Sequence, residues 1–236
     1  MVRFLIICLH YQNSVQIYYF WAMQQSTEHI GFFIKQYEQI SNHRHPQAYE
    51  MVADIVKPET ALEKLIIGQK DWMEGAFWGE PRTGHPEGKV IFHIREVLDN
   101  VDKITSNSKL REHLRLVSII HDNFKHLEET VRPRQDWTKH HAVYAMKFAQ
   151  NFIKEHHILN VIELHDEAYY AWHLNRKYPE TNRAFHRLNG LFERLGDDYK
   201  QLYYLFFKCD TFTGDKTRIP VQWFEDTVME INISTL

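Results

Sequence analysis

The sequence has little cysteine, no surplus of positive charge and no long uninterrupted apolar run. Its two cysteines, Cys8 and Cys209, stand far apart and form no C-x-x-C pair, so neither a disulfide framework nor a cysteine zinc site is predicted. Acidic residues outnumber basic ones by 31 to 28. Because no basic excess is available to neutralise phosphates, we expect a cytoplasmic protein without a stable nucleic-acid or membrane partner.

Several motifs that define enzyme classes are also missing. The chain has no G-x-x-x-x-G-K-[ST] phosphate loop, no G-x-S-x-G elbow and no H-E-x-x-H pair. No stretch alternates apolar and polar residues in the way a half-buried strand does. These absences disfavour a phosphate-loop enzyme, a serine hydrolase and a dinucleotide-binding fold.

The first 22 residues are apolar but interrupted by polar side chains, and no small-residue cleavage site follows them. They therefore fit neither a transmembrane helix nor a signal peptide. We treat residues 1–22 as an N-terminal extension of uncertain status; alternatively, Met23 is the natural start. The remaining residues, 23–236, are expected to form one domain, because 44% hydrophobic content supports a sizeable core.

Apolar residues recur at helical spacing through most of the chain, which predicts an all-α fold. Residues 74–88 are the exception, since they hold four of the nine glycines and are expected to form a long loop, either functional or merely connecting. The expected helices are 27–40, 47–56, 60–73, 90–101, 110–124, 138–156, 159–174, 181–195, 198–208 and 220–231.

Histidine and aspartate residues occupy two of these expected helices in a way that favours a metal site. His93 lies among core-facing turns of one helix, and the pair His121-Asp122 falls within the last turns of the next. Packed side by side, the two helices would bring imidazole nitrogens against a carboxylate. This ligand set suits Zn, Mn, Fe, Ni or Co better than Ca.

The order of these residues resembles the HD-domain family of metal-dependent phosphohydrolases. The run HPEGKVIFHIREVLD is similar to the segment that opens the HD domain of some bacterial tRNA nucleotidyltransferases, and HDNFK resembles the HDxxK of cyclic-dinucleotide phosphodiesterases. The resemblance covers about residues 80–215 and implies an HD-like helical bundle with extra N-terminal helices. It also implies that the H…HD…D ligands are His93, His121, Asp122 and Asp210.

A second metal ion is a further expectation from this resemblance. If Asp122 bridges two ions, His141 and His165 are the ligands of the second, in the order found in dinuclear HD phosphodiesterases. His140 competes with His141 for this role, and His165-Asp166 replaces the family's later histidine doublet. One ion or two therefore stays open, and Mg is also compatible with the ligands.

Three basic residues are candidates for binding a substrate phosphate. Lys125 lies nearly one helical turn after Asp122, Arg82 offers a bidentate fork, and His85 stands in the glycine-rich loop. Each also has a structural alternative, as a solvated side chain or a turn former. We assign Asp122, Lys125 and His165 as catalytic, while the general acid stays open among Glu167, Asp166 and water.

The predicted function is a metal-dependent phosphohydrolase, a phosphomonoesterase or a phosphodiesterase. Its expected partner is a small phosphorylated substrate, a nucleotide or a related metabolite, and a homo-oligomer is left open. Two alternatives remain: a catalytically silent HD-fold regulatory protein that binds a metal or a nucleotide, and a helical scaffold with fortuitous histidines.

Overall fold

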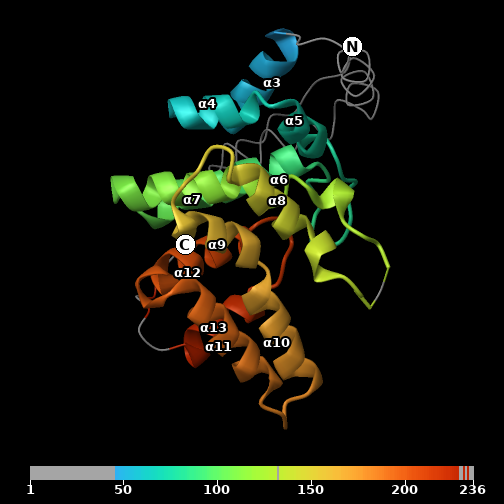
Figure 1. Ribbon diagram of the computed structural model, residues 1–236, viewed down its shortest axis with the longest axis vertical. Helices are drawn as coiled ribbons and strands as arrows, with labels where there is room; N and C mark the ends of the chain where they lie inside the picture. Colours follow the sequence, from blue (N-terminus) through green and yellow to red (C-terminus); the bar gives the residue numbers. More distant parts are fainter. Residues whose placement is uncertain (1–45, 132, 229–230, 232, 234–236) are drawn as a thin grey trace, which may run out of the picture. The chain divides into compact units, whose positions relative to one another are not determined.

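Helices make up nearly all of the regular structure in the computed structural model, which describes residues 46–131, 133–228, 231 and 233 (Figure 1). Within these residues there is no strand, only an isolated bridge between Arg82 and His85. The all-α prediction is therefore confirmed. Residues 1–22 and the helix expected at 27–40 lie outside the described residues.

The α-helices follow one another along the chain with three short 3₁₀ turns between them. Their bounds are α3 Pro46–Val56, α4 Ala61–Ile67, α5 Lys70–Ala76, α6 Val90–Ile104, α7 Ser108–Ile120, η1 Lys125–Leu127, η2 Trp137–Lys139, α8 His141–Ala149, α9 His156–Leu164, α10 Glu167–Lys177, α11 Arg183–Leu195, η3 Asp197–Tyr199, α12 Lys200–Thr211 and α13 Ile219–Thr227. In the described residues, no helix is both apolar enough and long enough to cross a bilayer.

Helix α6 belongs to the core of the described residues, since eight of its fifteen residues are buried. It packs against α7 and α12, while α3 contacts another side of it (Figure 1). Ile94, Leu98 and Val101 recur along α6 at spacings of three and four residues, and each is fully buried. Since burying one such side chain contributes roughly 1.5–3 kcal/mol, this face fixes the helix in the core.

Three expected helices are interrupted in the structure, and those predictions of continuous helix were wrong. The helix expected at 60–73 divides at Gly68 into α4 and α5, the one at 138–156 ends at Ala149, and the one at 159–174 breaks at His165-Asp166. In the two helices that divide, both pieces bury apolar side chains, so the apolar spacing continues across the break. Periodicity alone therefore does not reveal where a helix ends.

The pair His121-Asp122 lies just past the end of α7 rather than inside its last turns, because the helix ends at Ile120. Helix α5 holds this turn from one side. The indole N–H of Trp72 donates to the carbonyl of Ile119 over 2.8 Å, and the amide of Asn123 donates back to the carbonyl of Trp72. Buried hydrogen bonds to α5 thus fix the chain both before the His-Asp pair, at Ile119, and after it, at Asn123.

Candidate metal centre

Four side chains from three separate segments converge beside the end of α7. His93 comes from α6, His121 and Asp122 from the turn after α7, and Asp210 from the last turn of α12. The Nε2 atoms of His93 and His121 are 3.3 Å apart, and the first is 2.9 Å from Asp210 Oδ1. Asp122 Oδ2 lies 3.5 Å from His93 Nε2 and 3.4 Å from His121 Nε2. The structure thus brings the H…HD…D residues together. We call His93, His121, Asp122 and Asp210 the first group.

A second group, made of His141 and His165, lies beside the other oxygen of Asp122. Its Oδ1 atom is 3.3 Å from Nε2 of His141, the first residue of α8, and 3.5 Å from Nε2 of His165, which follows α9. The two imidazole nitrogens are 3.2 Å apart. Asp166 Oδ2 lies 3.6 Å from His141 Nε2 and 3.7 Å from His165 Nε2, on the outer side of the group. Asp122 therefore joins two groups of possible ligands.

The neighbouring histidine, His140, lies against Tyr170 and Asp166 rather than against Asp122. Its Nδ1 accepts from the backbone N–H of Ala142 and so caps α8, while its Nε2 lies 3.0 Å from the hydroxyl of Tyr170 and 3.4 Å from Asp166. Of the two candidates, His141 is therefore the one that meets Asp122.

The Nδ1 atoms of His121, His165 and His141 each lie against an acceptor. This orients the rings so that Nε2 points toward the candidate metal positions. Nδ1 of His121 donates to the carbonyl of Ser118 over 3.0 Å, and Nδ1 of His165 donates to that of Ile162 over 2.8 Å. His141 Nδ1 lies 2.7 Å from the carboxylate of Glu128. Such partners orient metal-binding histidines in known sites and fix the tautomer with a free Nε2.

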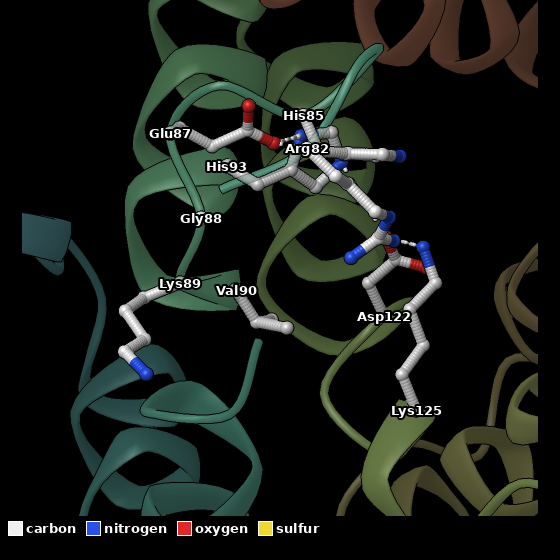
Figure 2. A pocket seen from close by; sticks show the side chains of 9 residues that line it. All are labelled: Arg82, His85, Glu87, Gly88, Lys89, Val90, His93, Asp122 and Lys125. Atoms are coloured by element: carbon white, nitrogen blue, oxygen red, sulfur yellow. Dashed lines mark hydrogen bonds and ion pairs between the residues drawn. The ribbon is translucent and has the colours of Figure 1, made fainter. Parts of the chain in front are cut away.

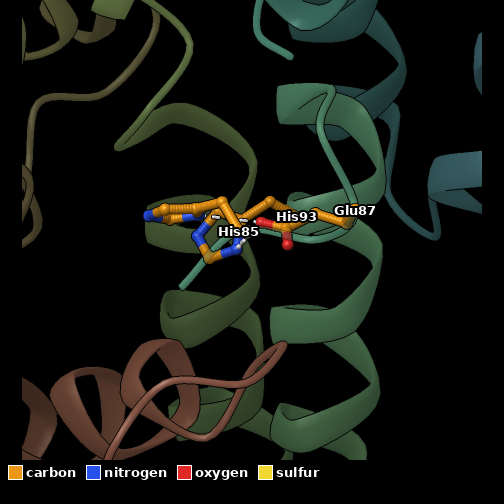
Figure 3. Close-up of side chains that lie close together, drawn as sticks. All are labelled: His85, Glu87 and His93. Atoms are coloured by element: carbon orange, nitrogen blue, oxygen red, sulfur yellow. Dashed lines mark hydrogen bonds and ion pairs between the residues drawn. The ribbon is translucent and has the colours of Figure 1, made fainter. Parts of the chain in front are cut away.

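His93 has a comparable neighbour in the glycine-rich loop. Glu87 Oε1 lies 3.4 Å from His93 Nδ1 and 2.9 Å from Nδ1 of His85 (Figure 3). The Glu87 side chain is almost fully buried, with 1% of its area exposed. The HPEG turn therefore places a carboxylate behind one ligand of the first group.

The charge states suit a cation. Burial works against the charge on Asp122, but His121 and Lys125 outweigh it and hold the pKa of that carboxyl well below its usual range. For Asp210, burial is likewise outweighed by Lys216 and His93, and its pKa is also well below the usual range. Burial, with the charge of Lys216 added, lowers the pKa of His93 to about 4, so this imidazole is neutral at pH 7.

The residues pass a test of fit for a divalent ion. Two nitrogen ligands at about 2.0–2.1 Å from one tetrahedral ion lie about 3.3–3.4 Å apart. The His93–His121 and His141–His165 separations of 3.3 and 3.2 Å are close to this value. In addition, Asp122 Oδ1 is buried and makes no hydrogen bond of ordinary geometry. Two sets of three could each hold a metal ion, since their ligand atoms lie within 4.8 Å of one another: His93 with His121 and Asp210, and Asp122 with His141 and His165.

His165 is the one ligand candidate whose pKa is raised. Burial opposes its charge, but Asp166 and Asp122 outweigh burial and raise its pKa to about 9. A metal ion must therefore displace a proton from this imidazole below pH 9, and the apparent affinity should rise about tenfold per pH unit there. Calorimetry in two non-coordinating buffers with different ionisation enthalpies should show release of about one proton per protein molecule at pH 7, when an ion fills the second group. Heats that do not depend on the buffer would contradict this.

The residues predicted to bind a phosphate lie at a small opening beside the first group (Figure 2). Lys125 Nζ is 2.5 Å from Asp122 Oδ2 at this place. Of the candidate general acids, Glu167 is held by Arg187 in a two-point ion pair, whereas Asp166 lies against the second group. The residues that line the opening include Arg82, His85, Glu87, His93, Asp122 and Lys125.

Two residues at the centre carried no signal in the sequence. Glu128 lies in the irregular segment after η1 and reaches His141, while Lys216 lies after α12 and reaches Asp210 Oδ1 at 3.0 Å. Neither belongs to a motif or a periodic pattern, so only the fold identifies them. No family model matches the chain, and no curated protein or solved structure matches it either.

Proposed function

We propose that this protein is a metal-dependent phosphohydrolase of the HD-domain type, acting on a phosphate ester of a nucleotide or a related metabolite. The observation that carries the proposal is the position of Asp122, whose two oxygens face two separate pairs of imidazole nitrogens. A carboxylate in this position can bridge two divalent ions. Mn, Fe, Zn, Ni and Co suit these ligands, and Mg is also compatible.

Divalent ions held here would lower the pKa of a water molecule and polarise a phosphoryl oxygen. The chain's own residues supply the rest of the chemistry. Lys125 carries a compact positive charge next to Asp122, where it can bind a phosphate oxygen, and Arg82 at the opening can bind a second oxygen. Asp166 lies beside the second group with 26% of its side chain exposed; burial raises the pKa of its carboxyl, but His165 and His141 outweigh burial and lower it. This carboxylate can therefore accept a proton from the attacking water, and a water molecule is left to protonate the leaving group.

The adjacent residues His140 and His141 provide a matched test. His141→Asn should lower manganese-dependent phosphate release by at least about 100-fold, because it removes a ligand from the second group. His140→Asn should lower it by less than about tenfold, because asparagine keeps the cap of α8. Equal losses in the two variants would contradict a second ion beside Asp122. Metal binding without turnover on a panel of monoesters and diesters would favour the silent regulatory protein instead.

A further inference from the structure

Lys216 belongs to the loop after α12, and its ammonium contacts an oxygen of Asp210 in the first group. Its ammonium is 3.0 Å from Asp210 Oδ1 and 3.1 Å from the backbone carbonyl of the same residue. The same Oδ1 is 2.9 Å from His93 Nε2. A cation that bound this oxygen would therefore meet Lys216 at the same point.

Hydrogen bonds to the glycine-rich loop and to α6 fix the position of the loop that carries Lys216. The N–H of Gly84 donates to Asp215 Oδ1 over 2.6 Å, and the N–H of Gly214 donates to Glu96 Oε2 over 2.9 Å. Gly214 has a φ of +54°, and a Cβ there would lie 2.9 Å from Pro86. The segment after α12 thus packs on the HPEG turn, which fixes the backbone that carries Lys216 beside the first group.

The two carboxylates of the first group are each paired with a lysine. Lys125 lies on Asp122 and Lys216 lies on Asp210. An ion about 2.0–2.2 Å from Asp210 Oδ1 would compete directly with the ammonium for that oxygen. Because a lysine has a flexible four-carbon stem, the ammonium can move off this oxygen and toward a nearby anion. A phosphate bound to the ion is the anion within reach.

We propose that Lys216 is a phosphate-binding residue which, together with Lys125, selects a dianionic phosphate monoester over a monoanionic diester. This inference rests on the proposed function and narrows its substrate class. The two lysines approach the first group from different segments, the start of η1 and the loop after α12. Two full positive charges beside the ion favour a ligand with two negative charges.

The test uses Lys216→Met, with Lys109→Met as the control, because Lys109 is an exposed residue at the start of α7. In manganese-loaded protein, Lys216→Met should bind inorganic phosphate at least about tenfold more weakly. Manganese itself should bind as tightly or more tightly, because a competing cation is gone. Lys216→Arg, which keeps the charge, should retain most of the phosphate affinity.

Hydrolysis supplies the second readout. Lys216→Met should lower kcat/KM for p-nitrophenyl phosphate at least about tenfold, but should change that for bis(p-nitrophenyl) phosphate less than about threefold. Unchanged phosphate binding, equal losses on the two substrates, or a loss of manganese binding would each overturn the proposal, the last by showing a structural role. If the wild type hydrolyses neither substrate but binds phosphate through Lys216, the phosphate-binding role of Lys216 stands, whereas the proposed function and the selection of a monoester substrate fail.

Discussion

Asp122→Asn is expected to lower metal-dependent phosphate release by at least about 1000-fold and to abolish binding of both ions. Asparagine has nearly the same shape as aspartate but no charge. Among the described carboxylates, Asp122 alone lies within 3.5 Å of imidazole nitrogens from both groups. Its loss therefore removes a ligand from both ions at once, and such losses exceed those of single neighbouring groups. Phosphate release and metal stoichiometry measure the two effects.

The control for this substitution is Asp226→Asn, because Asp226 is exposed on α13. Asp226→Asn should leave both activity and metal content unchanged. Thermal unfolding gives an independent readout, since manganese at 100 times its Kd stabilises a folded protein by about 2.7 kcal/mol. The ion should stabilise the wild type and fail to stabilise Asp122→Asn. A fully active Asp122→Asn would contradict the account of the site.

Gly75→Ala is expected to destabilise the protein by about 3–5 kcal/mol and to weaken metal binding. Gly75 lies in α5, where the helix meets the turn after α7, and a Cβ there would lie 1.5 Å from the backbone oxygen of Asn123. Because that atom belongs to the backbone, it cannot rotate away. The turn must move instead, and it carries His121-Asp122.

Gly190→Ala provides the matched control for this substitution. Gly190 lies in α11, and a Cβ there would have no heavy atom within 4 Å. Since alanine favours a helix by about 0.8–1.0 kcal/mol over glycine, Gly190→Ala should stabilise the protein slightly. Urea unfolding of the two variants measures both free energies. A Gly75→Ala protein as stable as the wild type would show that α5 does not support the turn as described.

The sequence allowed prediction of the all-α class and of the four residues that meet in the first group. The apolar residues of α6 recur at helical spacing, so the sequence itself shows that His93 shares a helix with core residues. The resemblance to the HD-domain pattern implied that His93, His121-Asp122 and Asp210 meet, and the structure brings them together. Their roles as ligands stay a prediction.

Helix ends and contacts from irregular segments could not be predicted. The choice between His140 and His141 depends on where α8 begins, because adjacent residues at a helix start point in different directions. His140 caps α8, and Asp136 caps the short turn η2 before it. Glu128 and Lys216 reach the site only through long-range packing, which no local pattern records.

The most direct test of the metal centre is anomalous diffraction from a crystal grown with manganese. The account predicts one peak among His93, His121, Asp122 and Asp210, and a second among Asp122, His141 and His165, each about 2.0–2.3 Å from the nitrogen and oxygen ligands. Manganese bound elsewhere, with no peak at Asp122, would contradict it.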